Sequence, residues 1–175
     1  DITRASGARN PSAVHYHFGN VESLFKEVFT QRFKAIEQER ALRLAKVDES
    51  DSARRLIALM AAAIAPFLES CLDEEGRLYV QFCLQFSSDP RFNLLELISE
   101  YGMPSLMALR AEVQACVPDI PEDVLNARLR QAFSISLVQA ADYARKLEAG
   151  FQIAPEQAVR EASTTLAGYI AAKSA

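Results

Sequence analysis

The sequence predicts an all-α fold, and three observations support this prediction. Glycine is scarce, with 6 among 175 residues, while alanine and leucine, which favour helices, are abundant. No long stretch alternates apolar and polar residues with the period of two that a half-buried strand shows. Short clusters of Gly, Pro, Asn and Asp divide the chain, and the loops that they form are short enough for one compact assembly.

The first breaks define a short helix followed by a long one. Residues 7–10 form a turn, and Asn10-Pro11 is a helix cap with proline at the first helical position. Gly19-Asn20 ends this short helix and caps the next. A long helix is then expected from about Val21 to Ala45, with apolar residues along one side.

The next expected helix is the most apolar of all. Residues 48–51 form an acidic joint and a cap, and the segment from about Ser52 to Leu72 is apolar nearly all round, which indicates a central position. We expect Pro66 to bend it. The longest mostly apolar run, residues 56–68, is interrupted by this proline and falls short of the roughly 18–20 residues that a membrane span needs. No membrane partner is therefore expected.

Turn-forming residues divide the rest of the chain into five further helices, which are expected to begin after Gly76, at Pro90, at Ser105, at Asp119 and at Pro155. The segment Asp119–Glu122 resembles a capping box, with an acceptor at the cap and a glutamate three residues on. Gly150 is expected to stop the helix that this box opens.

Charge and cysteine usage narrow the classes of function. Residues 1–34 hold five Lys or Arg against three acidic residues, whereas the other residues hold 14 basic and 20 acidic ones. A mildly basic head on an acidic body suits nucleic acid at one end only, because attraction to phosphate is local. Cys71, Cys83 and Cys116 lie far apart without metal-ligand spacing, so we expect reduced cysteines, no metal site and no cofactor.

The first residues predict a helix-turn-helix. Ile2 and Ala5 are apolar positions that end one helix, and Gly7 supplies the left-handed turn. Residues 11–17 then form a helix too short to stand alone, and it carries hydroxyl, imidazole and phenol groups. Such a second helix enters the DNA major groove, where short polar side chains reach base edges and others hold phosphates.

These residues resemble the signature of the TetR family of transcriptional regulators. The resemblance rests on Asp1–Gly7, on Ser12-Ala13-Val14-His15-Tyr16-His17-Phe18-Gly19-Asn20, and on Glu22-Ser23-Leu24-Phe25. It implies an all-α protein with an N-terminal helix-turn-helix head, whose first helix is expected to be missing from this sequence. A long helix joins the head to a helical ligand-binding and dimerisation body. We expect the head to span residues 1–34 and the body residues 35–175.

The resemblance also implies which residues contact DNA. Ser12 and Ala13 match positions that face bases, and Tyr16 or His15 takes the phosphate role. Val21 stands where a lysine is usual, so one phosphate contact should be missing. The expected DNA-binding set is Asn10, Ser12, Ala13, His15, Tyr16 and His17.

Soft apolar side chains beside a few polar ones indicate an effector pocket in the body. The candidates are Met60, Tyr79, Phe82, Cys83, Phe86, Met103, Met107, Gln139 and Tyr143. Plain core packing is the alternative for this set.

The last two expected helices have broad apolar and small-residue faces, as a four-helix dimer interface requires. The candidate interface residues are Phe133, Leu137, Ala140, Ser163, Leu166, Ala167 and Ile170. The alternative is a layer buried within one chain.

We therefore expect a cytoplasmic, homodimeric repressor that binds double-stranded operator DNA and is released by a small apolar or aromatic effector. We expect no catalytic residues, because His15 and His17 point to different sides of a helix and no nucleophile or carboxylate motif accompanies them. The alternative is a helical small-molecule binding or carrier protein without DNA activity.

Overall fold

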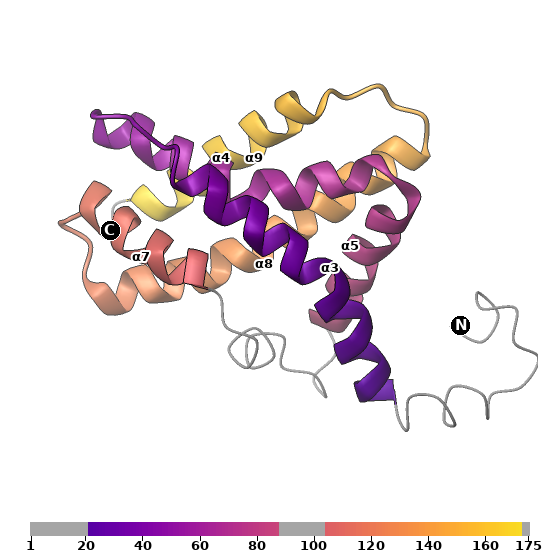
Figure 1. Ribbon diagram of the computed structural model, residues 1–175. Coiled ribbons are helices and arrows are strands. Elements are labelled where there is room, and N and C mark those ends of the chain that lie inside the picture. The colour runs from indigo at the N-terminus through magenta and orange to yellow at the C-terminus, as the bar shows by residue number, and fades with distance from the viewer. Residues whose placement is uncertain (1–20, 88–103, 173–175) are drawn as a thin grey trace, which may run out of the picture.

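A computed structural model describes residues 21–87 and 104–172, and all regular structure in these two ranges is helical (Figure 1). The elements are α3 (Val21–Leu44), α4 (Ser52–Glu69), a 3-10 turn (Ser70–Leu72), α5 (Glu74–Ser87), α7 (Pro104–Cys116), α8 (Glu122–Glu148) and α9 (Pro155–Ala171). The predicted all-α fold is confirmed. The expected DNA-contacting residues, Met103 and the helix expected to begin at Pro90 lie outside the described residues.

Helix α3 crosses the body diagonally, and its first turns extend beyond the other helices (Figure 1). Its bounds lie within one residue of the predicted 21–45. The buried side chains Phe29, Phe33, Ile36 and Arg40 recur at helical spacing, so one stripe of α3 faces the body. Phe29 and Phe33 therefore pack with the body, although the expected head ends at residue 34.

Helix α4 lies at the centre of the assembly and packs against α9, α3 and α7. Its predicted cap forms, because the side chain of Asp51 accepts a hydrogen bond of 2.9 Å from the amide of Arg54. The stretch Ser52–Leu72 is, among the described residues, long and apolar enough to span a membrane, so the argument that it is too short was wrong. Leu59 and Leu68 are only 1% exposed, as in a core helix.

Helix α5 begins at Glu74, before Gly76 rather than after it. The side chain of Asp73 accepts a hydrogen bond of 2.6 Å from the Gly76 amide and so caps the first turn. A Cβ atom at Gly76 would lie 1.6 Å from the carbonyl oxygen of Ser70. Glycine is therefore required here by close backbone approach, and it does not mark the end of a loop.

Helix α8 differs from the prediction at its start and agrees with it at its end. The helix begins at Glu122 with Pro121 at the cap position, and no side chain caps it, so the predicted capping box was wrong. At the other end, the amides of Gly150 and Phe151 donate to the carbonyls of Leu147 and Lys146, each at 3.0 Å. Gly150 has φ 85°, which completes a Schellman motif and stops the helix as predicted.

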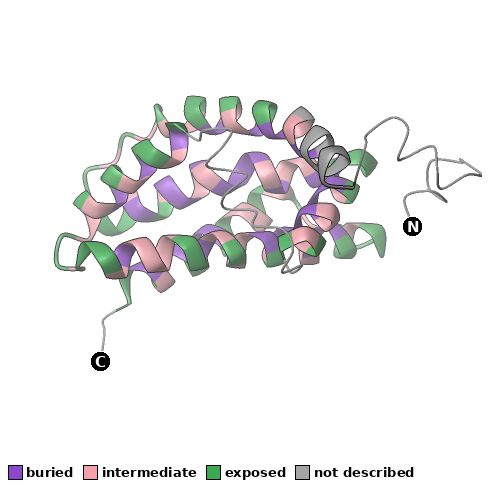
Figure 2. Cartoon of the chain, turned by 90° about the horizontal axis from the view of Figure 1, so that it is seen from below, coloured by how far each residue is buried: buried purple, intermediate pink, exposed green. Residues whose placement is uncertain are grey.

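The small-residue face of α9 is buried within the chain, against α4 and α8. Figure 2 shows buried positions where helices face one another and exposed positions on their outer sides. The expected interface residues Ala140, Ser163, Leu166, Ala167 and Ile170 are all at most 5% exposed in the single chain. Their assignment to a dimer interface is therefore corrected to the intramolecular layer that was the alternative.

The α9 assignment predicts the effect of a charge at Ala167. We expect Ala167→Glu to lower the free energy of unfolding by about 3 kcal/mol or more, because the carboxylate would be buried without a partner. The matched change Ala53→Glu, on the exposed first turn of α4, should stay within about 0.5 kcal/mol of wild type. Urea unfolding of both variants tests this, and equal stabilities would show that the inner face of α9 is not a core surface.

Candidate functional site

A cavity of about 150 Å³ lies inside the bundle, and all six described α-helices contribute to its wall. The lining residues are mainly apolar: Phe29, Phe33, Ile36, Arg40, Met60, Ala63, Ile64, Phe67, Tyr79, Cys83, Leu106, Leu109, Leu129, Ala132, Phe133, Ser136, Leu137 and Leu166. An apolar cavity with a few polar groups is the usual form of a small-molecule site.

Aromatic rings form the side of the cavity next to α3. Phe29 and Phe33 stack with ring centroids 4.8 Å apart, and Phe29 lies 6.4 Å from Tyr79. Phe67 meets Tyr79 edge to face at 6.3 Å. These rings offer faces and edges to an apolar guest, and the offset and edge-on arrangements are those that aromatic rings prefer.

The charged group in the wall is Arg40, which is 7% exposed. Its Nε donates to the carbonyl oxygen of Ala63 at 2.9 Å, and its Nη1 donates to Glu37 Oε2 at 2.6 Å. The other carboxylate oxygen of Glu37 accepts from the Ser105 amide at 2.9 Å. Burial lowers the pKa of Arg40, while the adjacent Glu37 carboxylate acts to raise it. This pair joins α3 to α4 and to the start of α7.

The remaining polar groups of the wall are suited to binding rather than to reaction. The hydroxyl of Ser136 donates to the Phe133 carbonyl at 2.7 Å, and that of Tyr79 donates to the Phe29 carbonyl at 3.4 Å. Burial raises the pKa of Tyr79, and it raises the pKa of Cys83 to about 12, so neither ionises at neutral pH. The described residues contain no group of three or more His, Cys, Asp or Glu that could hold a metal ion.

The structure brings part of the predicted pocket together and separates the rest. Met60, Tyr79 and Cys83 line the cavity. Phe82 and Phe86, with ring centroids 4.6 Å apart, pack against the neighbouring aromatic cluster and are not part of the wall.

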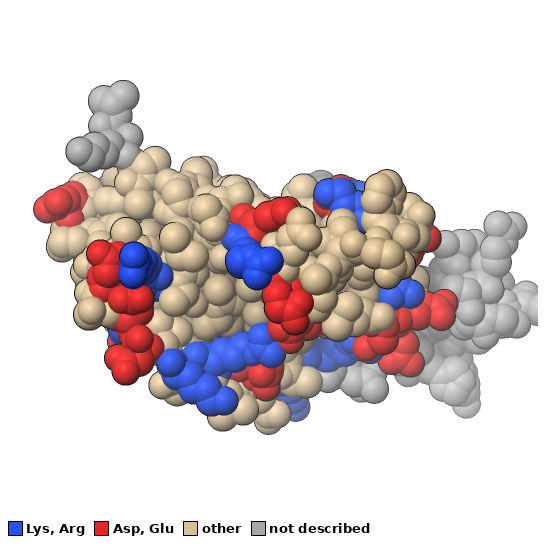
Figure 3. Space-filling model, turned by 90° about the horizontal axis from the view of Figure 1, so that it is seen from above, with Lys and Arg blue, Asp and Glu red and all other residues tan. Residues whose placement is uncertain are grey.

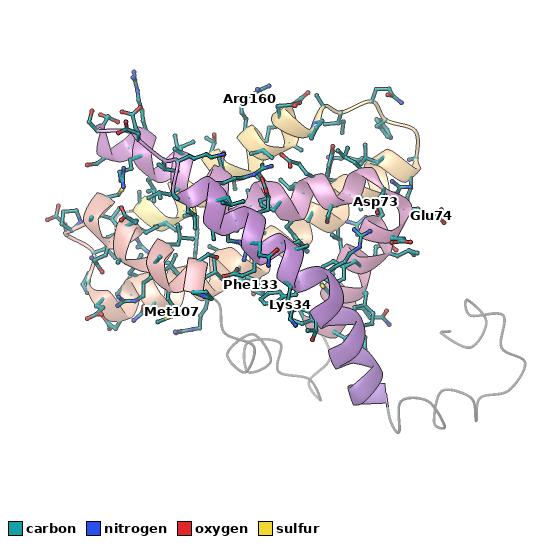
Figure 4. The ribbon with its side chains drawn as sticks, in the orientation of Figure 1. Lys34, Asp73, Glu74, Met107, Phe133 and Arg160 are labelled. Carbon is teal, nitrogen blue, oxygen red and sulfur yellow. The ribbon has the colours of Figure 1, made fainter. Side chains whose placement is uncertain are left out.

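Met107 lies outside the cavity. It is 72% exposed, and Figure 4 shows it at the outer edge of α7. Helix α7 turns Ser105, Leu109 and Val113 inward at a spacing of four residues, which leaves Met107 on the opposite side.

Gln139 and Tyr143 lie at a second hollow between α8 and α9, of about 220 Å³. Lys146 and Asp142 form an ion pair of 2.8 Å at its edge, and the Tyr143 hydroxyl donates to the Ile153 carbonyl at 3.2 Å. Gln139 Oε1 is buried without a hydrogen-bond partner there. Gln139 and Tyr143 therefore belong to a separate and more polar pocket.

Sequence reasoning missed the contribution of α3 and placed two wall residues elsewhere. Phe133 and Leu137, expected at a dimer interface, line the cavity instead, and Figure 4 places Phe133 beside α3. The apolar side of α3 was recognised, but its four cavity residues were not assigned to the pocket. The available signal was Arg40, a charged residue that follows Ile36 by four positions on an otherwise apolar stripe.

One face of the body carries paired charges. On the face in Figure 3, basic and acidic side chains lie beside one another, with a broad uncharged area around them. Arg43 binds both oxygens of Glu69 at 2.8 and 2.7 Å, and Arg55 pairs with Glu112 at 2.5 Å. Where basic and acidic side chains are paired, their charges balance. Such a face does not present the excess of positive charge that binds a phosphate backbone.

Comparison with protein families gives a match over more than half of the chain. The family model described as "Tetracyclin repressor-like, C-terminal domain" matches residues 61–172. This range contains the second half of α4 and all of α5, α7, α8 and α9. No curated protein and no solved structure matches the chain.

The burial of the cysteines predicts which of them react with a thiol reagent. Burial raises the pKa values of Cys71 and Cys83 to about 12, so roughly one molecule in ten thousand carries either thiolate at pH 8. We expect dithionitrobenzoate to label the partly exposed Cys116 in the native protein and to label the other two only after denaturation. Cys116→Ser should remove the fast phase. A fast phase that persists in this variant would show that the wall at Cys83 is open.

Proposed function

The chain belongs to the TetR family of regulators, and from this premise we propose that it is a transcriptional repressor that a small apolar or aromatic molecule releases from operator DNA. The family membership supports transcription regulation. DNA binding by residues 1–34, repression and the class of effector are the proposed parts. A regulator of this kind works beside the chromosome, so we propose that it acts in the cytoplasm.

The observation that carries the proposal is the shared wall between the cavity and α3. Four side chains of this helix, Phe29, Phe33, Ile36 and Arg40, line the cavity. The same helix leads back toward the expected DNA-binding head. A molecule that enters the cavity would therefore contact α3 directly, and α3 is the helix that would position the head.

The length of α3 makes it a suitable lever. Its 24 residues span about 36 Å at 1.5 Å per residue. Two recognition helices must lie one or more DNA turns apart, at multiples of about 34 Å, to engage both half-sites. A small tilt of α3 at the cavity would move its far end enough to change that spacing.

Release requires that the effector prefers the state that does not bind DNA. A molecule that binds both states equally shifts nothing, however tightly it binds. A coupling of about 1–3 kcal/mol, or 5- to 150-fold in DNA affinity, is the usual scale for such linkage.

We also propose a homodimer that forms through the outward faces of α8 and α9, because their inward faces pack within the chain. Val138 on α8 is 53% exposed, and Thr164 and Gly168 lie on the exposed side of α9. No heavy atom lies within 4 Å of a Cβ built at Gly168. Uncharged and small side chains there would let a second copy approach closely.

Toluene, an apolar ring that suits a cavity of this size, tests the switch. We expect it to raise the melting temperature of the full-length gene product and to lower its affinity for its own upstream DNA by 5- to 150-fold in a gel shift. Cys83→Phe should fill the cavity and abolish both responses while toluene-free DNA binding persists.

The matched control is Leu78→Phe, which adds the same ring to an exposed position of the same helix and should keep both responses. Stabilisation by toluene without any DNA binding would favour a small-molecule carrier and contradict the repressor proposal.

The proposed dimer predicts opposite outcomes for two exposed apolar positions. We expect Val138→Glu to yield monomers in sedimentation velocity at micromolar concentration, because a carboxylate would be placed in the contact. Leu78→Glu, at a position 58% exposed on α5, should remain dimeric. A dimer that survives Val138→Glu would move the contact to another face.

A further inference from the structure

Arg40 is the residue of the cavity wall that still has hydrogen-bond donors without a partner in the described part of the chain. A guanidinium carries five N–H donors and no acceptor. The Nε and Nη1 atoms are engaged by Ala63 and Glu37, but Nη2 has no hydrogen-bond partner within the described part of the chain. Arg40 is 7% exposed and lines the cavity. Arg40 therefore carries N–H groups without a protein acceptor in the described part of the chain, on a side chain that lines the cavity.

The two hydroxyls of the wall already donate to backbone carbonyls. Ser136 and Tyr79 each donate their only O–H to a backbone carbonyl, at 2.7 and 3.4 Å. Their oxygens retain acceptor capacity, but a guest that needs a strong donor must find it on Arg40. The wall thus favours a guest with one hydrogen-bond acceptor.

Charge balance determines what kind of acceptor fits. Glu37 lies 2.6 Å from Nη1 of Arg40 and already neutralises it. A carboxylate guest would add a second negative charge, and this charge would be unbalanced among apolar side chains. A carbonyl oxygen makes the same contact with Nη2 without bringing a charge.

The volume of the cavity suits a single ring as the rest of the guest. A dry apolar cavity of about 150 Å³ is large enough for benzene, and this cavity has that volume and is partly open to solvent. One ring with a short substituent therefore fits it.

We propose that the cavity selects an uncharged, single-ring compound with one carbonyl-type acceptor, which Nη2 of Arg40 binds. This inference rests on the proposed effector site, but it concerns the chemical class of ligand and does not depend on DNA binding. Arg40 belongs to α3, and its partner Glu37 accepts a hydrogen bond from the Ser105 amide at the start of α7. The ligand would therefore bind where α3 is joined to the body.

Three compounds of nearly equal shape separate the contributions of the ring, the carbonyl oxygen and a negative charge to binding. Acetophenone has the ring and the carbonyl, α-methylstyrene replaces the carbonyl oxygen by a methylene group, and benzoate carries a negative charge. By isothermal titration of the protein at pH 7, we expect acetophenone to bind at least about 10-fold more tightly than either of the others, as a hydrogen bond to a charged donor predicts.

Variants of Arg40 test whether this preference comes from the guanidinium. The double variant Arg40→Met/Glu37→Gln removes both charges together, so no buried charge is left alone. It should reduce the ratio of acetophenone to α-methylstyrene affinity to about one. Arg43→Lys, on the same helix but outside the cavity wall, should leave the ratio unchanged. The ratio is measured within each variant, so a general loss of stability does not imitate the effect.

Several results would overturn the inference. Equal affinities for acetophenone and α-methylstyrene in the wild type would remove the acceptor contact, and tighter binding of benzoate would remove the requirement for a neutral guest. An unchanged ratio in the double variant would remove Arg40. If α-methylstyrene binds as tightly as acetophenone and still lowers DNA affinity, this inference fails while the proposed function stands. If acetophenone binds preferentially but DNA affinity is unaffected, the ligand class stands and the proposed function fails.

Discussion

The buried guanidinium of Arg40 connects three helices at the wall of the cavity. A charge at this depth is tolerated when hydrogen bonds from neighbouring groups and a counter-charge accompany it. The Ala63 carbonyl supplies the first from α4, and Glu37 supplies the second from α3 while it also accepts from the Ser105 amide of α7. The path of α3 over the body, and with it the shape of the cavity, depends on this junction.

Two further arginines of α3 form ion pairs with the body, Arg32 near the start of the cavity stripe and Arg43 just after its end. Arg43 makes a bidentate contact with Glu69, and Arg32 reaches Asp73 at 2.8 Å and Glu75 at 3.2 Å. These pairs are partly exposed and contribute little stability singly, but they define where α3 is held. The stretch from Phe33 to Arg40 lies between these two points and lines the cavity. A guest in the cavity would act on the helix between these points.

The sequence predicted features that depend on local chemistry. The cap at Asp51, the bounds of α3 and the stop at Gly150 follow from side chains and dihedral angles within a few residues, and all three are as predicted. The face that a helix presents to a neighbour depends on tertiary packing. Ala167 and Ile170 suit a dimer contact and an internal layer equally well, because both environments are apolar.

The candidate pocket shows the same limit. Met60 and Cys83 lie on helices whose inward faces are broad, and both line the cavity, whereas the position of Met107 depends on the rotation of a short helix. Arg40 was missed because a lone arginine on an apolar stripe is usually a side chain whose charged end reaches water. Its partner Glu37, three residues earlier, shows its role only when α7 is placed beside it.

A small molecule that enters the cavity would contact α3 directly. Nuclear Overhauser effects between bound toluene and methyl-labelled isoleucine and methionine detect such a contact. We expect transfer from the toluene ring to the methyl groups of Ile36 and Met60, which line the cavity, and none to the exposed Met107. Transfer to Met107 without transfer to Ile36 would place the molecule on the outer surface and contradict the coupling of cavity and helix.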